Sequence, residues 1–152
     1  MCGITITGIT MKQISTPQKI VSSFEPVSFP DFSSALQVSA KIDTGAYTGA
    51  LHCTKISEEE TEAGKVLHFS PFDHPEVEIV STDFVVRHVR SSNGKAQNRY
   101  FIKTVIEIQG KTYPIVLSLA DRSEMKWPVL IGRRFLRTHK FLVDVNRKTS
   151  VL

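Results

Sequence analysis

The residues best suited to chemistry in this sequence are Asp43, Thr44 and Gly45, which follow the alternating apolar and polar segment 36–42. One ionised carboxylate is a weak catalyst, but two that share a proton act as a base and an acid, because like charges about 3 Å apart are not both ionised. Such a pair activates a water molecule and protonates a departing amine. We expect Thr44 to hold the loop through its hydroxyl group and Gly45 to let the backbone approach the carboxylate.

The chain carries one copy of this tripeptide. A shared proton therefore requires a second carboxylate from another chain, and the sequence predicts a homodimer with one Asp43 in each subunit. An ordinary turn remains the alternative, since Asp and Gly are both common turn residues.

A second candidate segment lies near the C-terminus, where the apolar residues 127–131 stop at Gly132 and a basic segment follows. The pattern predicts a strand that ends at the glycine and a short helix over 133–139. A core strand that ends at any turn has the same pattern. We expect Arg133 either on a solvated helix face or against carboxylates of a second subunit.

A third candidate segment lies between the first two and contains Ser91, Ser92, Asn93 and Gly94. Asn-Gly is a strong signal for a tight β-hairpin turn. The hairpin is either a plain surface feature or a cover over the site, which would exclude water and grip a substrate.

The elements that must position these segments are short apolar or alternating stretches separated by turn residues. They indicate strands at 66–69, 77–80, 84–89, 100–109, 112–119 and 141–145. A tight turn is expected at Gly110 and Lys111, and a solvated loop over the acidic residues 57–62. The fold class is therefore all-β, or mainly β: a closed barrel with one short C-terminal helix. Residues 1–22 are expected to form an N-terminal arm or edge strand, and residues 23–152 one folded domain.

The bulk composition is that of one globular domain, with 152 residues of which 41% are hydrophobic and 22% charged. The net charge of +4 comes from basic residues spread along the chain, which argues against nucleic acid as a partner. No run of about 18 apolar residues is present, so we expect no membrane span. The two cysteines, Cys2 and Cys53, and the first residues, which lack the pattern of a secretory leader, predict a cytoplasmic location.

Neither a metal ion nor another cofactor is expected. The sequence has no His-Glu-x-x-His motif, and its five histidines are scattered over predicted strands and loops. It also has no Gly-rich phosphate-binding loop that ends in Lys-Ser or Lys-Thr. Cys53 lies beside His52, but neighbours in a strand point to opposite faces, so we expect Cys53 to be a buried packing residue.

In this order, the Asp-Thr-Gly motif, the Asn-Gly hairpin and the segment Leu130-Ile131-Gly132-Arg133 resemble the retroviral-type aspartic peptidases, or retropepsins. The resemblance implies a closed acid-protease barrel with one lobe per chain, catalysis at Asp43, and a dimer contact at Gly132 and Arg133. In this family the hairpin that covers the site is called the flap. The resemblance also implies a set of residues that contact the substrate: Ala46, Tyr47, Ile131 and the flap residues Ser91, Ser92, Asn93 and Gly94.

A wider match includes residues 40–52, 119–125, 128–136 and 141–144. These segments are similar to a family of small prokaryotic proteins that are labelled ATP-dependent zinc proteases, are regarded as retropepsin-like, and are often encoded beside or fused to RimK-type ATP-grasp ligases. The resemblance implies a homodimeric aspartic endopeptidase that acts on peptides or proteins, with a RimK-type ligase as a further partner. A non-catalytic module that binds a peptide or partner on the same fold remains the alternative, because Tyr47 is bulky beside the catalytic loop.

Overall fold

The computed structural model of the protein describes residues 18–90 and 94–149, apart from the side chains of residues 34 and 35. No helix in this described part is long and apolar enough to cross a membrane. The elements are β1 (Lys19–Val21), β2 (Phe24–Phe29), β3 (Ser33–Asp43), β4 (Gly49–Thr61), β5 (Gly64–Pro71), β6 (Ile79–Ser81), β7 (Phe84–Arg90), β8 (Ala96–Ile108), β9 (Lys111–Ala120), β10 (Val129–Gly132), α2 (Arg133–Thr138) and β11 (Phe141–Val143).

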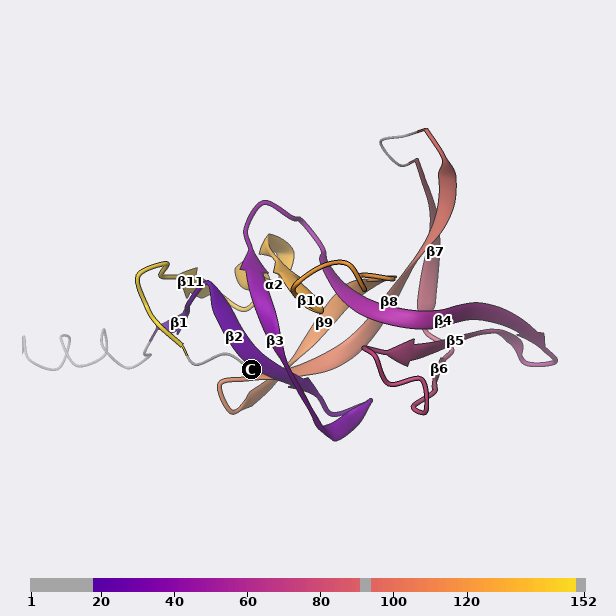
Figure 1. Ribbon diagram of the computed structural model, residues 1–152, viewed down its shortest axis with the longest axis horizontal. Coiled ribbons are helices and arrows are strands. Elements are labelled where there is room, and N and C mark those ends of the chain that lie inside the picture. The colour runs from indigo at the N-terminus through magenta and orange to yellow at the C-terminus, as the bar shows by residue number, and fades with distance from the viewer. Residues whose placement is uncertain (1–17, 91–93, 150–152) are drawn as a thin grey trace, which may run out of the picture.

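Six strands close into a barrel in the order β10, β3, β2, β8, β9 and β4, and β4 pairs with β10 to complete the ring. β10 runs parallel to β3 and β4 runs parallel to β9, whereas the other neighbouring pairs are antiparallel. The short helix α2 follows β10 directly (Figure 1). The predicted mainly β closed barrel with one short C-terminal helix is confirmed.

The core of the barrel follows from the two-residue period of its strands, since successive side chains of a strand point to opposite faces. In β8, Ile106 and Ile108 are buried, whereas Glu107 between them is exposed. In β9, Ile115 and Leu117 are buried in the same way. Each such side chain contributes about 1.5–3 kcal/mol by leaving water, so the alternation that identified these strands also fixes which face is inside.

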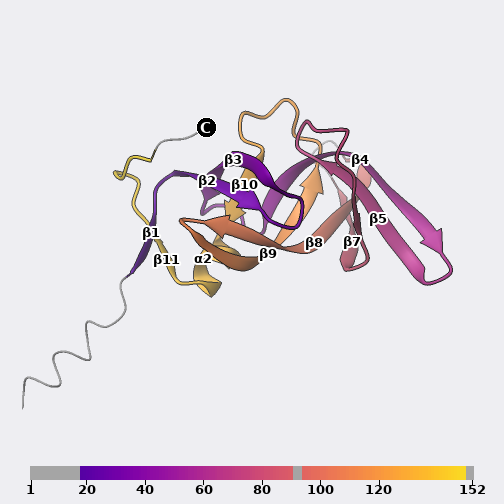
Figure 2. The same cartoon turned by 90° about the horizontal axis from the view of Figure 1, so that it is seen from below.

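Two hairpins extend beyond the barrel (Figures 1 and 2). β7 pairs with the first part of β8, and the far part of β4 pairs with β5. Residues 57–61 belong to β4, so the prediction of a loop over the acidic run 57–62 is wrong, although these side chains are exposed. Pairing with β5 satisfies the backbone while the charged side chains stay in water, and the acidic composition alone does not reveal this.

The turn between β8 and β9 consists of Gln109 and Gly110, because Ile108 pairs with Lys111. The sequence prediction placed this turn one residue later, at Gly110 and Lys111, and is wrong. Gln109 and Gly110 have positive φ angles of 53° and 79°, as a tight two-residue hairpin turn of this kind requires. The strand register decides which two residues form the turn.

β1 and β11 form a separate two-stranded parallel sheet, which brings part of the predicted N-terminal arm against the C-terminal strand. β11 ends at Val143, earlier than the predicted strand 141–145.

β6 begins later than the predicted strand 77–80, because the backbone N–H of Val77 bonds to the carbonyl oxygen of His74 and closes a turn.

Candidate active site

Asp43 is the last residue of β3 and lies beside Gly132, the last residue of the parallel strand β10. Its side chain is partly exposed, and its Oδ1 accepts a hydrogen bond of 3.0 Å from the backbone N–H of Gly45. The carboxylate is therefore oriented from within its own loop. Two strand ends that meet side by side hold this acidic group at one end of the barrel.

The loop between β3 and β4 is anchored on the start of α2. The backbone N–H of Arg133 donates a hydrogen bond of 2.8 Å to the Ala46 carbonyl oxygen, and that of Arg134 donates one of 3.0 Å to the Tyr47 carbonyl oxygen. At Gly132 a Cβ atom would lie 2.6 Å from the Tyr47 oxygen. No side chain fits where β10 meets this loop unless the loop shifts. This close contact explains why position 132 of the predicted motif is a glycine.

The side chain of Arg133 holds the same loop. Its Nη1 donates hydrogen bonds of 3.0 Å to the Gly45 carbonyl oxygen and 3.4 Å to the Thr44 carbonyl oxygen. Its guanidinium lies 5.6 Å from the centre of the Tyr47 ring, and Tyr47 is 54% exposed. Within one chain Arg133 therefore stabilises the loop that carries the acid, and its contact with a second subunit stays a prediction.

Ile131 differs from the substrate-contact role that the resemblance implied. It is fully buried and pairs with Ile42 across β10 and β3. Because β10 has a strand on each side and this residue points into the core, its side chain packs inside the barrel rather than lining an open surface.

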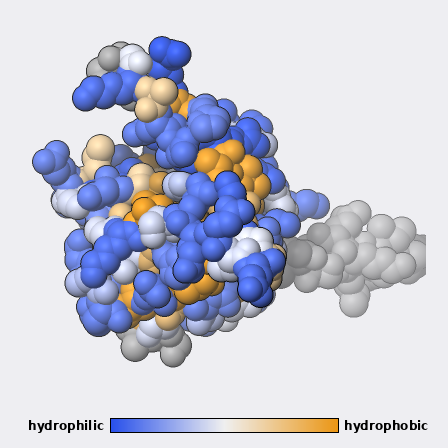
Figure 3. Space-filling model, turned by 90° about the vertical axis from the view of Figure 1, so that its right-hand side faces the viewer, coloured by the Kyte–Doolittle hydropathy of each residue, from blue (hydrophilic) through white to orange (hydrophobic). Residues whose placement is uncertain are grey.

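The predicted flap is the hairpin of β7 and β8, and it projects from the barrel on the same side as the loop after Asp43 (Figure 1). Hydrophobic atoms are exposed on the body of the protein below its tip (Figure 3). Gly94 has a positive φ of 85°, in keeping with a turn. Ser91, Ser92 and Asn93 lie outside the described residues, so their contacts with a substrate stay predictions.

A buried histidine is bonded to the segment that carries Arg122, and the sequence did not predict its partners. His52 in β4 is 2% exposed, its Nδ1 accepts a hydrogen bond of 2.8 Å from the backbone N–H of Arg122, and its Nε2 lies 2.8 Å from Oδ1 of Asp73. Because Nδ1 is the acceptor, the proton of the neutral ring is on Nε2 and is donated to the carboxylate. The partners are far apart in sequence, so no local signal pointed to them.

Arg122 brings a positive charge toward Asp43. Its Nε donates a hydrogen bond of 3.3 Å to the Trp127 carbonyl oxygen. Burial lowers the pKa of Arg122, and the Asp43 carboxylate opposes that decrease. The guanidinium thus lies within electrostatic range of the candidate catalytic acid.

Cys53 is fully buried, and burial raises the pKa of its thiol. A thiol held in its neutral form is a poor nucleophile, so the prediction that Cys53 is a packing residue is confirmed. In the part of the chain that the structure describes, no group of three or more His, Cys, Asp or Glu side chains is arranged to hold a metal ion.

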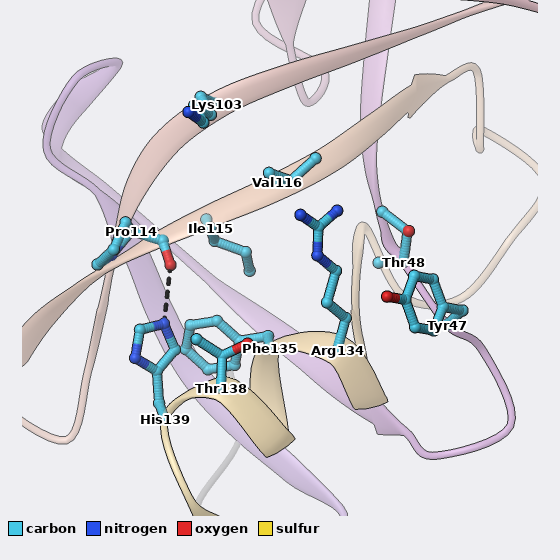
Figure 4. A pocket seen from close by; sticks show the side chains of 11 residues that line it. Tyr47, Thr48, Lys103, Pro114, Ile115, Val116, Arg134, Phe135, Thr138 and His139 are labelled. Atoms are coloured by element: carbon cyan, nitrogen blue, oxygen red, sulfur yellow. Dashed lines mark hydrogen bonds between the residues drawn. The ribbon is translucent and has the colours of Figure 1, made fainter.

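Two adjoining cavities open beside Tyr47, with volumes of about 170 Å³ and 400 Å³. Lys103, Val116 and Arg134 line both. Figure 4 shows the smaller cavity, with the Arg134 side chain directed from α2 toward the side of β9. A third cavity of about 610 Å³ lies on another side of the loop, where Thr44 meets residues of α2 and β11.

Comparisons with known proteins extend these observations. The family model described as RimB-like, retropepsin-like aspartic endopeptidase RimB, matches residues 20–151. Curated relatives from Shewanella pealeana and Shewanella halifaxensis, both named probable alpha-L-glutamate ligase, are 30% identical over 130 residues. Each match covers 82% of this chain, and the chain spans 28% of the relative's length.

The fold has a solved counterpart. A crystal structure of a protein of unknown function from Legionella pneumophila superposes with a TM-score of 0.69 and 24% sequence identity. The match covers 88% of this chain and 98% of the other. At this identity the likeness concerns the fold alone.

Proposed function

The chain belongs to the RimB-like family of retropepsin-like aspartic endopeptidases, and from this premise we propose that it hydrolyses peptide bonds as a homodimer with one Asp43 from each subunit. The observation that carries the proposal is the placement of Asp43 at a strand end, partly exposed and held by the N–H of Gly45. Among the described residues, no second carboxylate forms a hydrogen bond with Asp43. We therefore place the carboxylate that would share its proton on another chain.

The surface next to Asp43 supports association with a second copy. Thr44 and Arg133 line the cavity of about 610 Å³ together with apolar residues of α2 and β11. Leu142 in β11 is 49% exposed. β1 and β11 pair only with each other in the described part of the chain, which leaves strand edges available to another chain. A second subunit seated here would cover this surface and bring its own loop toward Asp43.

The proposed reaction returns the pair of carboxylates to its starting state. The ionised Asp43 takes a proton from a water molecule, and the hydroxide attacks the carbonyl carbon of the peptide bond. The protonated Asp43 of the other subunit donates its proton to the carbonyl oxygen. When the C–N bond breaks, the carboxyl group that took the proton from water gives it to the departing amine, and a hydroxyl group of the tetrahedral diol returns its proton to the other carboxylate. One proton therefore again remains on the pair.

Substrate binding would use the cavity of about 400 Å³ between the loop after Asp43 and the β7–β8 hairpin. An extended peptide forms backbone hydrogen bonds in such a groove, and pockets for its alternate side chains give specificity. Peptides that contain glutamate belong in any substrate screen, because the matched relatives are named for glutamate ligation. Association with a RimK-type ligase is proposed on the same ground.

The test is cleavage of an unbiased peptide library from about pH 3 to about pH 8 by the wild type and Asp43→Asn, with the solution mass of both. Cleavage by a wild-type dimer and its loss in a folded, dimeric variant would support the proposal. A confirmed dimer that cleaves nothing at any pH would overturn it.

A second candidate function is a non-catalytic module that binds a peptide or a ligase. It is favoured by the match to a segment that makes up 28% of the probable ligases, and by the large exposed ring of Tyr47 beside the loop. In that case Asp43→Asn would leave binding to the partner and the partner's activity unchanged. Loss of peptide cleavage on the same substitution would exclude this alternative as the whole function.

A further inference from the structure

One face of the β4–β5 hairpin carries a histidine between two carboxylates. Nε2 of His68 lies 3.0 Å from Oε1 of Glu59, and its Nδ1 lies 3.5 Å from Oε2 of Glu78. His68 belongs to β5, Glu59 belongs to β4, and Glu78 directly precedes β6. We call these three residues the His68 clamp. Their side chains connect neighbouring strands of one sheet.

The strand register places the three side chains on the same face. His68 pairs with Ser57 of β4 and with Val80 of β6. Glu59 is two residues from the first of these partners, and Glu78 is two residues from the second. Side chains two residues apart point to the same face of a sheet, and long side chains reach a diagonal neighbour at this offset. The contacts of His68 therefore follow from the pairing of the strands.

A neutral imidazole can donate a hydrogen bond to only one of the two carboxylates. Its ring has one N–H group, and the other nitrogen presents a lone pair. The protonated ring has an N–H group on each nitrogen and can donate to Glu59 and Glu78 together. The hydrogen bond to Glu59 raises the pKa of His68 most, burial opposes this increase, and Glu78 adds to it. Both contacts are hydrogen bonds only when His68 is protonated.

No other cation competes for these carboxylates. Within the described residues, no Lys or Arg lies within ion-pair distance of Glu59 or Glu78. Lys65 is three residues from His68 along β5, so its side chain lies on the opposite face, where its Nζ is 3.5 Å from Oε2 of Glu58. β6 itself has no charged residue. Glu59 and Glu78 are thus the charged groups that act on His68.

β6 is the strand that depends most on the His68 clamp. It has three residues and pairs with β5 on one side, and no strand in the described part of the chain pairs with its other side. Residues 82 and 83 alone separate it from β7, which begins at Phe84 (Figure 1). A short edge strand with few backbone bonds opens at a low free-energy cost. A bond between Glu78 and His68 therefore affects how firmly the start of the β7–β8 hairpin is held.

We propose that the His68 clamp is a pH-sensitive device that holds β6, and with it the start of the β7–β8 hairpin, when His68 is protonated. A histidine with a raised folded pKa contributes stability that is complete below its unfolded pKa of about 6.5 and is lost as pH rises through the folded pKa. Below about pH 4 the glutamates are protonated as well, and the bonds weaken again. The device requires no reaction at Asp43, so its test is independent of peptide cleavage.

The experiment measures amide hydrogen exchange in the full chain by NMR at about pH 5.5 and about pH 8, as protection factors that correct for intrinsic exchange rates. The wild type is compared with His68→Gln, which has no ring to protonate, and with Glu59→Gln plus Glu78→Gln. His88→Gln is the matched control, because His88 is an exposed histidine of β7 that forms no ion pair with the described residues. The ring signals of His68 are also titrated in the wild type and in the double glutamine variant.

We expect the protection of the β6 amides, relative to the β9 amides, to be about two- to fivefold higher at the lower pH in the wild type, which is the range that exposed ion pairs supply. The difference should disappear in His68→Gln and in the double glutamine variant and persist in His88→Gln. The midpoint of the His68 titration should fall in the double glutamine variant.

Equal relative protection at both pH values in the wild type would overturn the proposal, and this comparison needs no variant. An unchanged His68 midpoint without the two carboxylates would overturn it too. A pH difference that survives in His68→Gln would assign the effect to another group and would equally contradict the clamp.

Discussion

Nδ1 of His52 accepts a hydrogen bond of 2.8 Å from the backbone N–H of Arg122, and this bond ties β4 to the segment that brings a guanidinium toward Asp43. His52 is buried, so water does not replace the bond if the ring is removed. His52 therefore helps to fix the position of the backbone segment that carries Arg122.

Substitution of His52 tests this relationship through stability. His52→Leu leaves the Arg122 N–H without an acceptor and should lower the free energy of unfolding by about 1–3 kcal/mol. His52→Asn offers an amide oxygen close to the position of Nδ1 and should cost less. Asp73→Asn should have a small effect, because the Asp73 side chain is 84% exposed. Chemical denaturation measures all three, and equal losses for the leucine and asparagine variants would contradict the assignment.

Two glycines of the site should respond differently to alanine. At Gly132 a Cβ would lie 2.6 Å from the Tyr47 oxygen, and the loop must move, which should cost about 1–3 kcal/mol of stability. At Gly45 a Cβ would lie 3.3 Å from Oδ1 of Asp43, so the carboxylate shifts by little. Gly45→Ala should therefore reduce kcat more than it reduces stability. Thermal unfolding measures the effect of each substitution on stability, and peptide cleavage measures its effect on activity. A Gly132→Ala protein with wild-type stability would contradict the close contact between Gly132 and the Tyr47 loop.

The Tyr100 hydroxyl donates a hydrogen bond of 2.7 Å to Oε1 of Glu58 and joins the flap strand β8 to β4. The bond lowers the pKa of Glu58. A carboxyl group with a lowered folded pKa stabilises the protein above its unfolded pKa of about 4.3, and this stabilisation is lost as pH falls through the folded pKa.

Tyr100→Phe should therefore lower Tm at neutral pH, and the difference from the wild type should shrink as the pH falls below about 4. Glu58→Gln should flatten this part of the stability profile. The check is Tm measured across the acidic range. A Tyr100→Phe deficit that stays constant with pH would show that the bond is not linked to ionisation of Glu58.

Much of this architecture could be predicted from the sequence, because the patterns that identify it lie within single segments of the chain. The alternation in β8 and β9 and the glycine after Ile131 predicted the barrel strands and the start of α2. The Asp-Thr-Gly motif predicted an acid at a strand end. What was missed depends on pairing between distant segments. The acidic part of β4 is a strand because β5 pairs with it, and His52 is hydrogen-bonded to Asp73 and Arg122, which are far from it in sequence. No pattern within one segment encodes such partners.

The central claim is that Asp43 acts as a pair across two subunits, and mixing tests it most directly. Wild type and Asp43→Asn are combined in equal amounts, subunits are allowed to exchange, and exchange is verified by native mass spectrometry. If both carboxylates are needed, only the wild-type homodimers are active, and random pairing makes these about one quarter of all dimers. The mixture should then have about one quarter of the activity of an equal total amount of protein that is entirely wild type. About one half of that activity would mean that each subunit acts alone, and would contradict the account.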